Sequence, residues 1–364
     1  MNRITNFFSS RWGIIGTGLF IGVVAALLQK WGNPGNMGVC VACFERDIAG
    51  SIGLHRADLV QYMRPEIIGF VIGALIAAYL FKEFRPRGGS SPIIRFVLGM
   101  FAMIGALVFL GCPWRALLRL AGGDWNAILG IIGLGVGVGI GALFLRSGYD
   151  LGRSGKTHVT AGIMFPLIML GFLVLVFIFP YIQGHSINGI LFYSIKGPGS
   201  MHAPLAISLI VGLAIGFVAQ RSRFCTMGAL RDLFLFRQAH LFSGIVALVF
   251  AAFITNLIVG QFHPGFANQP VAHTMGLWNF LGMAVAGLAF ALAGGCPGRQ
   301  LFLAGEGDGD AAIFVVGMIV GAAIAHNFGL ASSPAGIGPH GVVGVITGLA
   351  VCIFIGFSFR HKTA

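Results

Sequence analysis

The segment GCPWRALLRLAGGD at residues 111–124 recurs as GCPGRQLFLAGEGD at residues 295–308, and this recurrence decides the architecture. Seven of the fourteen positions are identical without a gap. An earlier segment, CVACFERD at residues 40–47, has a weaker copy in CTMGALRD at residues 225–232, with Cys, Arg and Asp in the same order. Both copies are displaced by 184 or 185 residues, so the two halves of the chain are related.

The composition around these segments is that of a membrane protein. Of the 364 residues, 57% are hydrophobic and 9% are charged, and the mean hydropathy is +0.90. Soluble domains have about a quarter of their residues charged, so an ordinary soluble globule is excluded, as is a disordered chain. No hydrophilic stretch is long enough to fold into a nucleic-acid-binding module. We predict an all-α polytopic membrane protein with a single transmembrane domain over residues 1–364.

Apolar runs close to the roughly 20 residues that a membrane-spanning helix needs occur ten times. We place them at about 12–30, 66–82, 93–110, 127–146, 160–180, 204–220, 240–260, 275–294, 310–327 and 341–358. One weak run could dip into the membrane and return, which would leave nine crossings. Alternating the loops between two sides assigns sixteen of the 23 Lys and Arg residues to one side, Arg3 and Lys362 among them. Since cytoplasmic loops are enriched in Lys and Arg, both termini are predicted to be cytoplasmic.

The repeat also predicts how the two halves sit in the membrane. The first five spans, about 12–180, correspond to the last five, about 204–358, and a shift by an odd number of spans reverses direction. Such inverted-topology repeats are characteristic of transporters. Polar segments follow a span end at four equivalent places, residues 33–51, 111–124, 221–235 and 295–310. Each is too short and too polar to cross alone, so we predict short re-entrant helices that meet at the membrane centre.

Five of the six cysteines lie in these polar segments. In Gly-Cys-Pro-x-Arg the proline suits the first helical position, which places the cysteine at the N-cap. A helix N-terminus attracts anions, and an arginine one turn further on adds positive charge. A polarizable thiol beside such a charge suits a soft anion. The predicted substrate pathway therefore contains Cys40, Cys43, Cys112, Cys225, Cys296, Arg115 and Arg299. The alternative for the two arginines is pairing with Asp124 or Asp308, or extension of their side chains to the lipid headgroups.

Adjacent opposite charges predict structural ion pairs at the short helices, Arg46 with Asp47 and Arg231 with Asp232. Cys40 and Cys43 form a CxxC, which by itself indicates redox exchange or a metal site. Its second cysteine is replaced by Gly228 in the other half, and no second CxxC completes a zinc site. We expect no metal and no cofactor. Since no span interior contains Asp or Glu, coupling to protons is not expected either.

At these residues the sequence resembles the YeeE/YedE sulfur-transport family, especially its selenium-associated YedE branch. The match is strongest in the two GCPxR segments, in RSRFCTMGALRD at 221–232 and in VCVACFERDIAG at 39–50. The resemblance implies uptake of thiosulfate or a related selenium or sulfur anion across a bacterial inner membrane. It also implies a thiol relay through Cys40, Cys112, Cys225 and Cys296, and a cytoplasmic TusA-like carrier as partner.

Three functions remain open from the sequence. The leading one is a membrane transporter, and not an enzyme, that imports a small selenium or sulfur anion. A membrane-embedded thiol–disulfide oxidoreductase using Cys40 and Cys43 is the main alternative. A soft-metal channel is the third, although such a channel needs Met, His or carboxylates beside the thiols, and only Met227 and Glu306 lie near them in sequence.

Overall fold

The computed structural model describes residues 7–360, so Arg3 and Lys362 lie outside the described part. Its long helices, in chain order, are α2 (Arg11–Lys30), α4 (Pro65–Leu80), α5 (Pro92–Phe109), α7 (Asn126–Arg146), α8 (Val159–Ile178), α9 (Leu205–Ser222), α11 (His240–Ile258), α12 (Gly276–Ala293), α14 (Gly309–Asn327) and α15 (Gly341–Ser358). Four shorter helices lie between them: α3 (Val41–Ser51), α6 (Pro113–Ala121), α10 (Thr226–Phe236) and α13 (Pro297–Gly305). The protein is all-α, as the sequence predicts.

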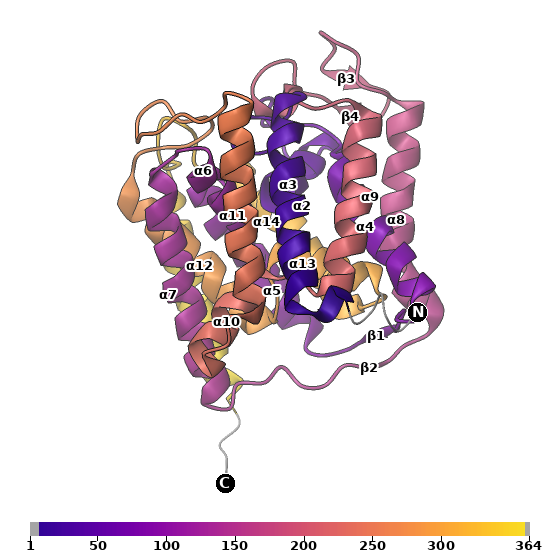
Figure 1. Ribbon diagram of the computed structural model, residues 1–364, viewed down its shortest axis with the longest axis vertical. Coiled ribbons are helices and arrows are strands. Elements are labelled where there is room, and N and C mark those ends of the chain that lie inside the picture. The colour runs from indigo at the N-terminus through magenta and orange to yellow at the C-terminus, as the bar shows by residue number, and fades with distance from the viewer. Residues whose placement is uncertain (1–6, 361–364) are drawn as a thin grey trace.

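The few extended segments are confined to the connections. Strand β1 (Arg87–Gly88) pairs antiparallel with β2 (Gly155–Lys156), and β3 (Ile187–Asn188) pairs antiparallel with β4 (Leu191–Phe192). A 3₁₀ turn, η1, covers Pro198–Ser200. The two strand pairs lie at opposite ends of the bundle, with β3 and β4 at the upper end in Figure 1.

Within residues 7–360, nine helical stretches are long and apolar enough to cross a membrane. They fall on nine of the ten predicted spans, and three of them run on into the short helices α6, α10 and α13. The tenth prediction, at about 66–82, corresponds to α4, which is apolar but has only 16 residues. The protein is therefore a multi-pass membrane protein, and α4 is its shortest long helix.

Helices of the first half pack against helices of the second half in matched pairs. Helix α2 lies along α11 while α4 lies along α9, and α5 lies along α14 while α7 lies along α12. Figure 1 shows the first two pairs at the front of the molecule. Glycines allow the close approach: an added Cβ on Gly133 or Gly137 of α7 would overlap the carbonyl oxygens of Phe280 and Ala284 on α12. Each half therefore completes the core of the other.

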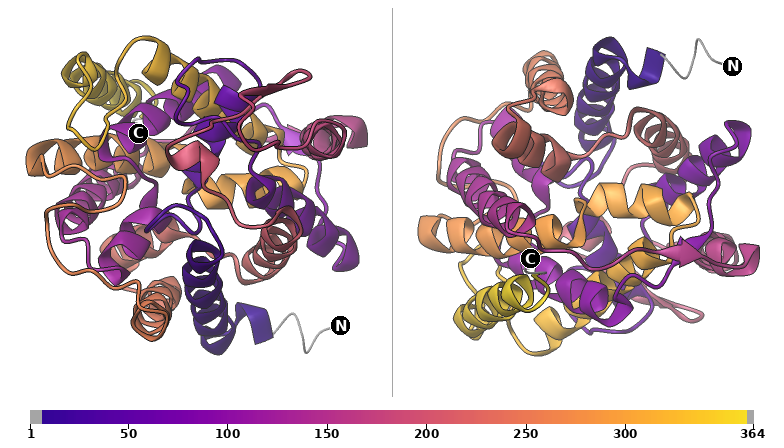
Figure 2. Two further views of the ribbon diagram at one scale, coloured as in Figure 1. Left: turned by 90° about the horizontal axis from the view of Figure 1, so that it is seen from above. Right: turned by 90° about the horizontal axis from the view of Figure 1, so that it is seen from below.

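Helices α3, α6 and α13 and the first turn of α10 lie inside this bundle. All eleven residues of α3 are buried, including its charged ones. The end-on views in Figure 2 show the long helices arranged around the interior that the short helices fill. In Figure 1, α3 and α6 lie higher in the bundle than α10 and α13. Non-helical backbone at membrane depth is tolerated where protein surrounds it, which is the environment of these four segments.

Candidate functional site

The first thiol pair consists of Cys40 and Cys112. Cys40 is the N-cap of α3 and Cys112 is the N-cap of α6, and both are buried. Pro113 occupies the first helical position of α6, as the Gly-Cys-Pro pattern predicts. The two Sγ atoms are 3.8 Å apart in an S–H···S contact. The Cys40 sulfur also accepts a hydrogen bond from the backbone N–H of Cys43 at 3.3 Å, so it faces the start of α3.

The second thiol pair repeats this arrangement with Cys225 and Cys296. Cys225 is the N-cap of α10, Cys296 is the N-cap of α13, and their Sγ atoms are 3.7 Å apart. The Cys225 sulfur accepts a hydrogen bond from the backbone N–H of Gly228 at 3.2 Å. The aligned cysteines of the two halves are therefore paired in the same way. Each pair joins the N-termini of two short helices, where unpaired backbone N–H groups carry partial positive charge.

Arg115 and Cys43 lie beside the first thiol pair. The Arg115 guanidinium contacts Cys43 Sγ at 3.8 Å and also donates to the carbonyl oxygens of Leu110 and of Asn36. Its remaining donors reach the carbonyls of Pro270 and Val271. Among the described residues, no carboxylate forms an ion pair with Arg115, although its side chain is fully buried. The first thiol pair thus has a buried cation whose charge no acid neutralises.

Arg299, the equivalent residue in the second half, has an acidic partner. Its guanidinium is 3.2 Å from Glu306, which also accepts from Arg223 at 2.8 Å. Glu306 aligns with Gly122 of the first half, where an added Cβ would overlap the Asn36 side chain. Asp124 pairs with Arg119 at 2.6 Å, and Asp308 pairs with Arg87 at 2.6 Å. The alternative pairing of Arg115 and Arg299 with Asp124 or Asp308 is therefore wrong.

A second acidic residue, Glu83, extends this charged network beside the second thiol pair. Glu83 follows α4 and forms ion pairs with Arg221 at 2.7 Å and with Arg223 at 2.8 Å. Burial raises the pKa of Glu83, but hydrogen bonds from Arg221 and Gln220 and the charge of Arg223 outweigh it, so the pKa lies below its ordinary value. Glu83 comes from the first half of the chain and its partners from the second, so the network ties the halves together.

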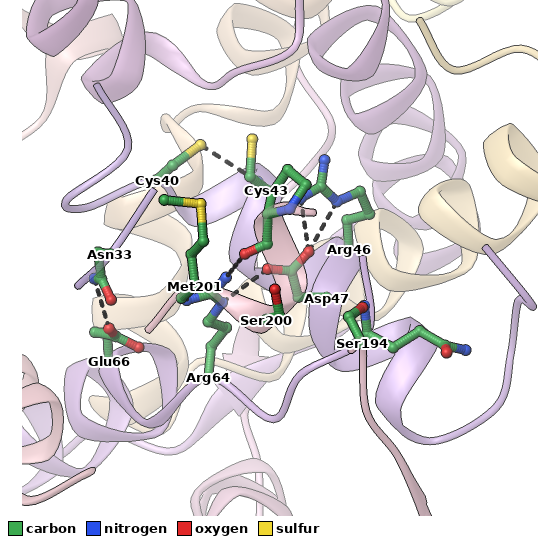
Figure 3. Close-up of polar contacts among 12 residues, drawn as sticks. Asn33, Cys40, Cys43, Arg46, Asp47, Arg64, Glu66, Ser194, Ser200 and Met201 are labelled. Carbon is green, nitrogen blue, oxygen red and sulfur yellow. Dashed lines mark hydrogen bonds and ion pairs between the residues drawn. The ribbon is translucent and has the colours of Figure 1, made fainter. Parts of the chain in front are cut away.

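The predicted structural ion pairs differ in their surroundings. Arg46 Nη2 is 2.7 Å from Asp47, and Arg64 Nε is 2.7 Å from the other oxygen of Asp47, with all three side chains buried (Figure 3). Arg64 donates further to the carbonyls of Pro198 and Met201. The second-half pair, Arg231 with Asp232 at 2.7 Å, is one-third and one-fifth exposed. Through Arg64, Asp47 of α3 is therefore connected to the loop that carries η1. The equivalent Asp232 of α10 has Arg231 as its ion-pair partner in the described structure and no counterpart of Arg64.

Sequence reasoning did not identify Glu45, Arg64 or Glu66 as site residues. Glu66, in the first turn of α4, accepts from Asn33 and Ser208, each at 2.9 Å. Glu45 of α3 is fully buried, and neither carboxyl oxygen has a hydrogen-bond partner in the described structure. In the sequence, Glu45 could have been noticed because the equivalent position of the other half is the apolar Leu230, which indicates that the position is buried.

An aromatic cluster separates the two thiol pairs. The ring of Trp114, in α6, lies 5.9 Å from Phe70, 5.7 Å from Phe224 and 6.1 Å from Phe302 between centroids. Phe224 precedes Cys225, and Phe302 belongs to α13. The cluster is fully buried, and it connects α6, which begins after Cys112, with the residue before Cys225 and with α13, which begins after Cys296. Cys352, the sixth cysteine, is buried within α15.

Comparison with known proteins matches residues 221–357 to a family described as Sulphur transport. The thiosulfate transporter TsuA of Spirochaeta thermophila is 34% identical over 99 residues, which cover 27% of this chain and 29% of that protein. The thiosulfate transporter TsuA of Escherichia coli K12 is 31% identical over 108 residues, covering 29% of this chain and 30% of that protein. The aligned region thus spans less than a third of each transporter.

A further relative is matched over nearly its whole length. An uncharacterized protein of Methanocaldococcus jannaschii is 33% identical over 96 residues, which cover 23% of this chain and 91% of that protein. The family match at 221–357 includes the second thiol pair and Arg299. These matches and the repeated segments lead to one conclusion: the chain belongs to the YeeE/YedE sulfur-transport family.

Proposed function

We propose that the protein is a membrane transporter that imports a small sulfur- or selenium-containing anion, such as thiosulfate. The observation that carries this proposal is the duplicated thiol pair, with Sγ–Sγ distances of 3.8 Å and 3.7 Å, at the buried N-termini of four short helices. Helix N-termini stabilise negative charge, and polarizable thiols suit a soft anion. The two thiosulfate transporters among the relatives support the substrate class.

The pathway that we propose runs through the thiols without covalent chemistry. The anion accepts S–H contacts from Cys40 and Cys112, with Cys43 and Arg115 beside it, and then passes to Cys225, Cys296 and Arg299. The charge of Arg115 favours binding at the first pair, because a buried cation whose partners are neutral carbonyls gains stabilisation when an anion approaches. Arg46 with Asp47 and Arg231 with Asp232 have a structural role in this proposal, holding the short helices in position.

The transport domain in this proposal is one unit of two inverted repeats, residues 12–180 and 204–358. It lies in a bacterial inner membrane with both termini in the cytoplasm, because the Lys and Arg residues of the chain gather on that side. Membrane lipid surrounds it, and a cytoplasmic TusA-like carrier receives the imported atom. The selenium-associated branch that the sequence resembles extends the proposed substrates to selenium anions.

The alternative is an oxidoreductase in which Cys40 and Cys43 exchange with Cys112. The Cys40–Cys112 contact at 3.8 Å fits that exchange as well as it fits a transport pathway. The second half favours transport, because Gly228 stands at the position equivalent to Cys43 and the thiol pair of that half therefore has no CxxC beside it.

The test is uptake of labelled thiosulfate and selenite into proteoliposomes that contain only this protein. We expect uptake by the wild type and by Cys352→Ala, a control in a buried cysteine outside both pairs. The double variant Cys112→Ala with Cys296→Ala should lose at least about tenfold, since each substitution removes a contact to a charged ligand. Undiminished uptake by the double variant would overturn the thiol pathway. If the wild type takes up neither ion, transport of these anions is wrong, and the redox state of Cys40 and Cys43 becomes the next measurement.

A further inference from the structure

The indole of Trp114 lies between the two thiol pairs. Trp114 is the second residue of α6, two positions after Cys112. Gly298 is the second residue of α13, two positions after Cys296. A Cβ added to Gly298 would lie 3.2 Å from Cζ2 and 3.4 Å from Cε2 of the Trp114 ring. The same ring packs against Phe224, the neighbour of Cys225. One side chain therefore connects the start of α6 to the start of α13.

The indole nitrogen of Trp114 has no partner. The side chain is 1% exposed, and Nε1 makes no hydrogen bond in the described structure. Buried polar atoms in proteins are almost always hydrogen-bonded, so an exception requires an explanation. Because the indole N–H can only donate, the missing partner must be an acceptor. Cε2 is bonded to Nε1, and Cε2 is one of the two ring atoms nearest to Gly298, so the indole N–H lies close to the start of α13.

The repeat explains why there is one such donor and not two. Gly298 is the residue equivalent to Trp114 in the second half. The ring of Trp114 occupies the space beside Gly298, so a second large side chain there has no room. A single indole thus serves both halves at the point where they meet. The N-termini of α6 and α13, each nine residues long, add positive potential on either side of it.

We propose that the Trp114 indole N–H is a mid-membrane hydrogen-bond donor for the transported anion, which it holds between Cys112 and Cys296. This inference rests on the proposed transport function and adds a residue to its pathway. The ligand class is a small anion with a terminal oxygen or sulfur acceptor. The surrounding Phe70, Phe224 and Phe302 exclude water, so that the donor meets no competing acceptor until the anion arrives.

The first test is Trp114→Phe, which retains a planar ring and removes the N–H. At subsaturating thiosulfate we expect uptake into proteoliposomes to fall about tenfold to a hundredfold, as for loss of a hydrogen bond to a charged group. The matched control is Trp125→Phe, which makes the same change at the partly exposed residue before α7, and its uptake should stay within about twofold of wild type. Wild-type uptake by a folded Trp114→Phe variant would overturn the proposal.

A second measurement leaves Trp114 unchanged. Replacing Trp12, Trp31, Trp125 and Trp278 by Phe makes Trp114 the only tryptophan of the five in the chain. Thiosulfate should then produce a saturable change in tryptophan emission, and no change would overturn the donor. The two measurements distinguish failure of the proposed transport function from failure of the proposed Trp114 donor. An emission change without wild-type uptake would support the donor and overturn transport, while uptake without an emission change would support transport and overturn the donor.

Discussion

Arg115 and Arg299 occupy equivalent positions of the repeated Gly-Cys-Pro-x-Arg segment, yet within residues 7–360 only Arg299 has a carboxylate partner. Arg299 is 3.2 Å from Glu306, whereas the Arg115 guanidinium is surrounded by carbonyl oxygens and the sulfur of Cys43. The difference follows from one aligned pair, Gly122 in the first half and Glu306 in the second. In the proposed transporter, an anion meets an unneutralised cation at the first thiol pair and a competing carboxylate at the second.

This asymmetry predicts the effect of Glu306→Gln. Without the competing charge, Arg299 should hold the anion longer, so the KM for thiosulfate uptake should fall about threefold to tenfold and the turnover rate should fall with it. Uptake kinetics in proteoliposomes measure both quantities. A variant that was merely misfolded would lower the turnover rate without lowering KM, so an unchanged or raised KM would contradict this role of Glu306.

In the first half, a carboxylate can be added near Arg115 instead of being removed, by substitution of Asn36. The Asn36 carbonyl already accepts from Arg115 at 3.3 Å, and Asn36 has a left-handed backbone with φ of 53°, which aspartate also tolerates. Asn36→Asp adds a carboxylate to a residue whose backbone carbonyl already contacts Arg115, so it lowers the positive potential at the first thiol pair. We expect KM for thiosulfate to rise about threefold to tenfold with little change in turnover. Equal KM values for Asn36→Asp and wild type would show that Arg115 does not contribute to anion binding.

The two Arg–Asp pairs should differ in their contribution to stability. Asp47→Asn leaves Arg46 and Arg64 buried without a counter-charge, and the expected loss in the free energy of unfolding is about 3–5 kcal/mol. Asp232→Asn, the equivalent change at the partly exposed pair, should cost only about 0–1 kcal/mol. Thermal unfolding of both variants in detergent compares them directly. If both variants lose a similar free energy of unfolding, the burial of an Arg–Asp pair does not determine its contribution to stability.

Glu45 offers a change that should stabilise the protein. Its carboxyl is buried without a partner, while the equivalent residue of the other half is Leu230. Glu45→Leu removes an unsatisfied polar group, so we expect the free energy of unfolding to rise by about 1–3 kcal/mol. Glu45→Gln, which keeps a polar group there, should stay close to wild type. A lower thermal midpoint for Glu45→Leu would show that the carboxyl has a partner in the membrane.

The network around Glu83 predicts a pH dependence. Because the pKa of Glu83 lies below its ordinary value, its ion pairs stabilise the fold above the ordinary carboxyl pKa, and this stabilisation is lost as the pH falls through the lowered pKa. The thermal midpoint of wild type should therefore exceed that of Glu83→Gln by a constant amount from pH 8 to about pH 5, and the difference should shrink below about pH 4. A difference that already shrinks between pH 7 and pH 5 would contradict the lowered pKa.

Local signals in the sequence were sufficient for the helices and their caps. The apolar runs predicted the long helices, and Gly-Cys-Pro predicted Cys112 and Cys296 at the N-caps of α6 and α13. Both features depend on residues close together in the chain, since a helix buries its own backbone polar groups and a cap uses its nearest N–H groups. The internal repeat also predicted that the two halves of the chain have equivalent helices and equivalent thiols.

Contacts between distant segments were decided only by the tertiary structure. The Cys40 and Cys112 sulfurs approach across 72 residues of chain, and Asp308 pairs with Arg87 from the other half instead of with Arg299. The sequence also did not reveal that Trp114 fills the space beside Gly298. An ion pair or a thiol contact forms where packing brings two side chains together. The contact of Trp114 with α13 and the packing of α4 against α9 are properties of the whole bundle. The sequence thus determined which thiols begin the short helices. The tertiary structure determined which thiols meet and which arginine has no carboxylate partner among the described residues.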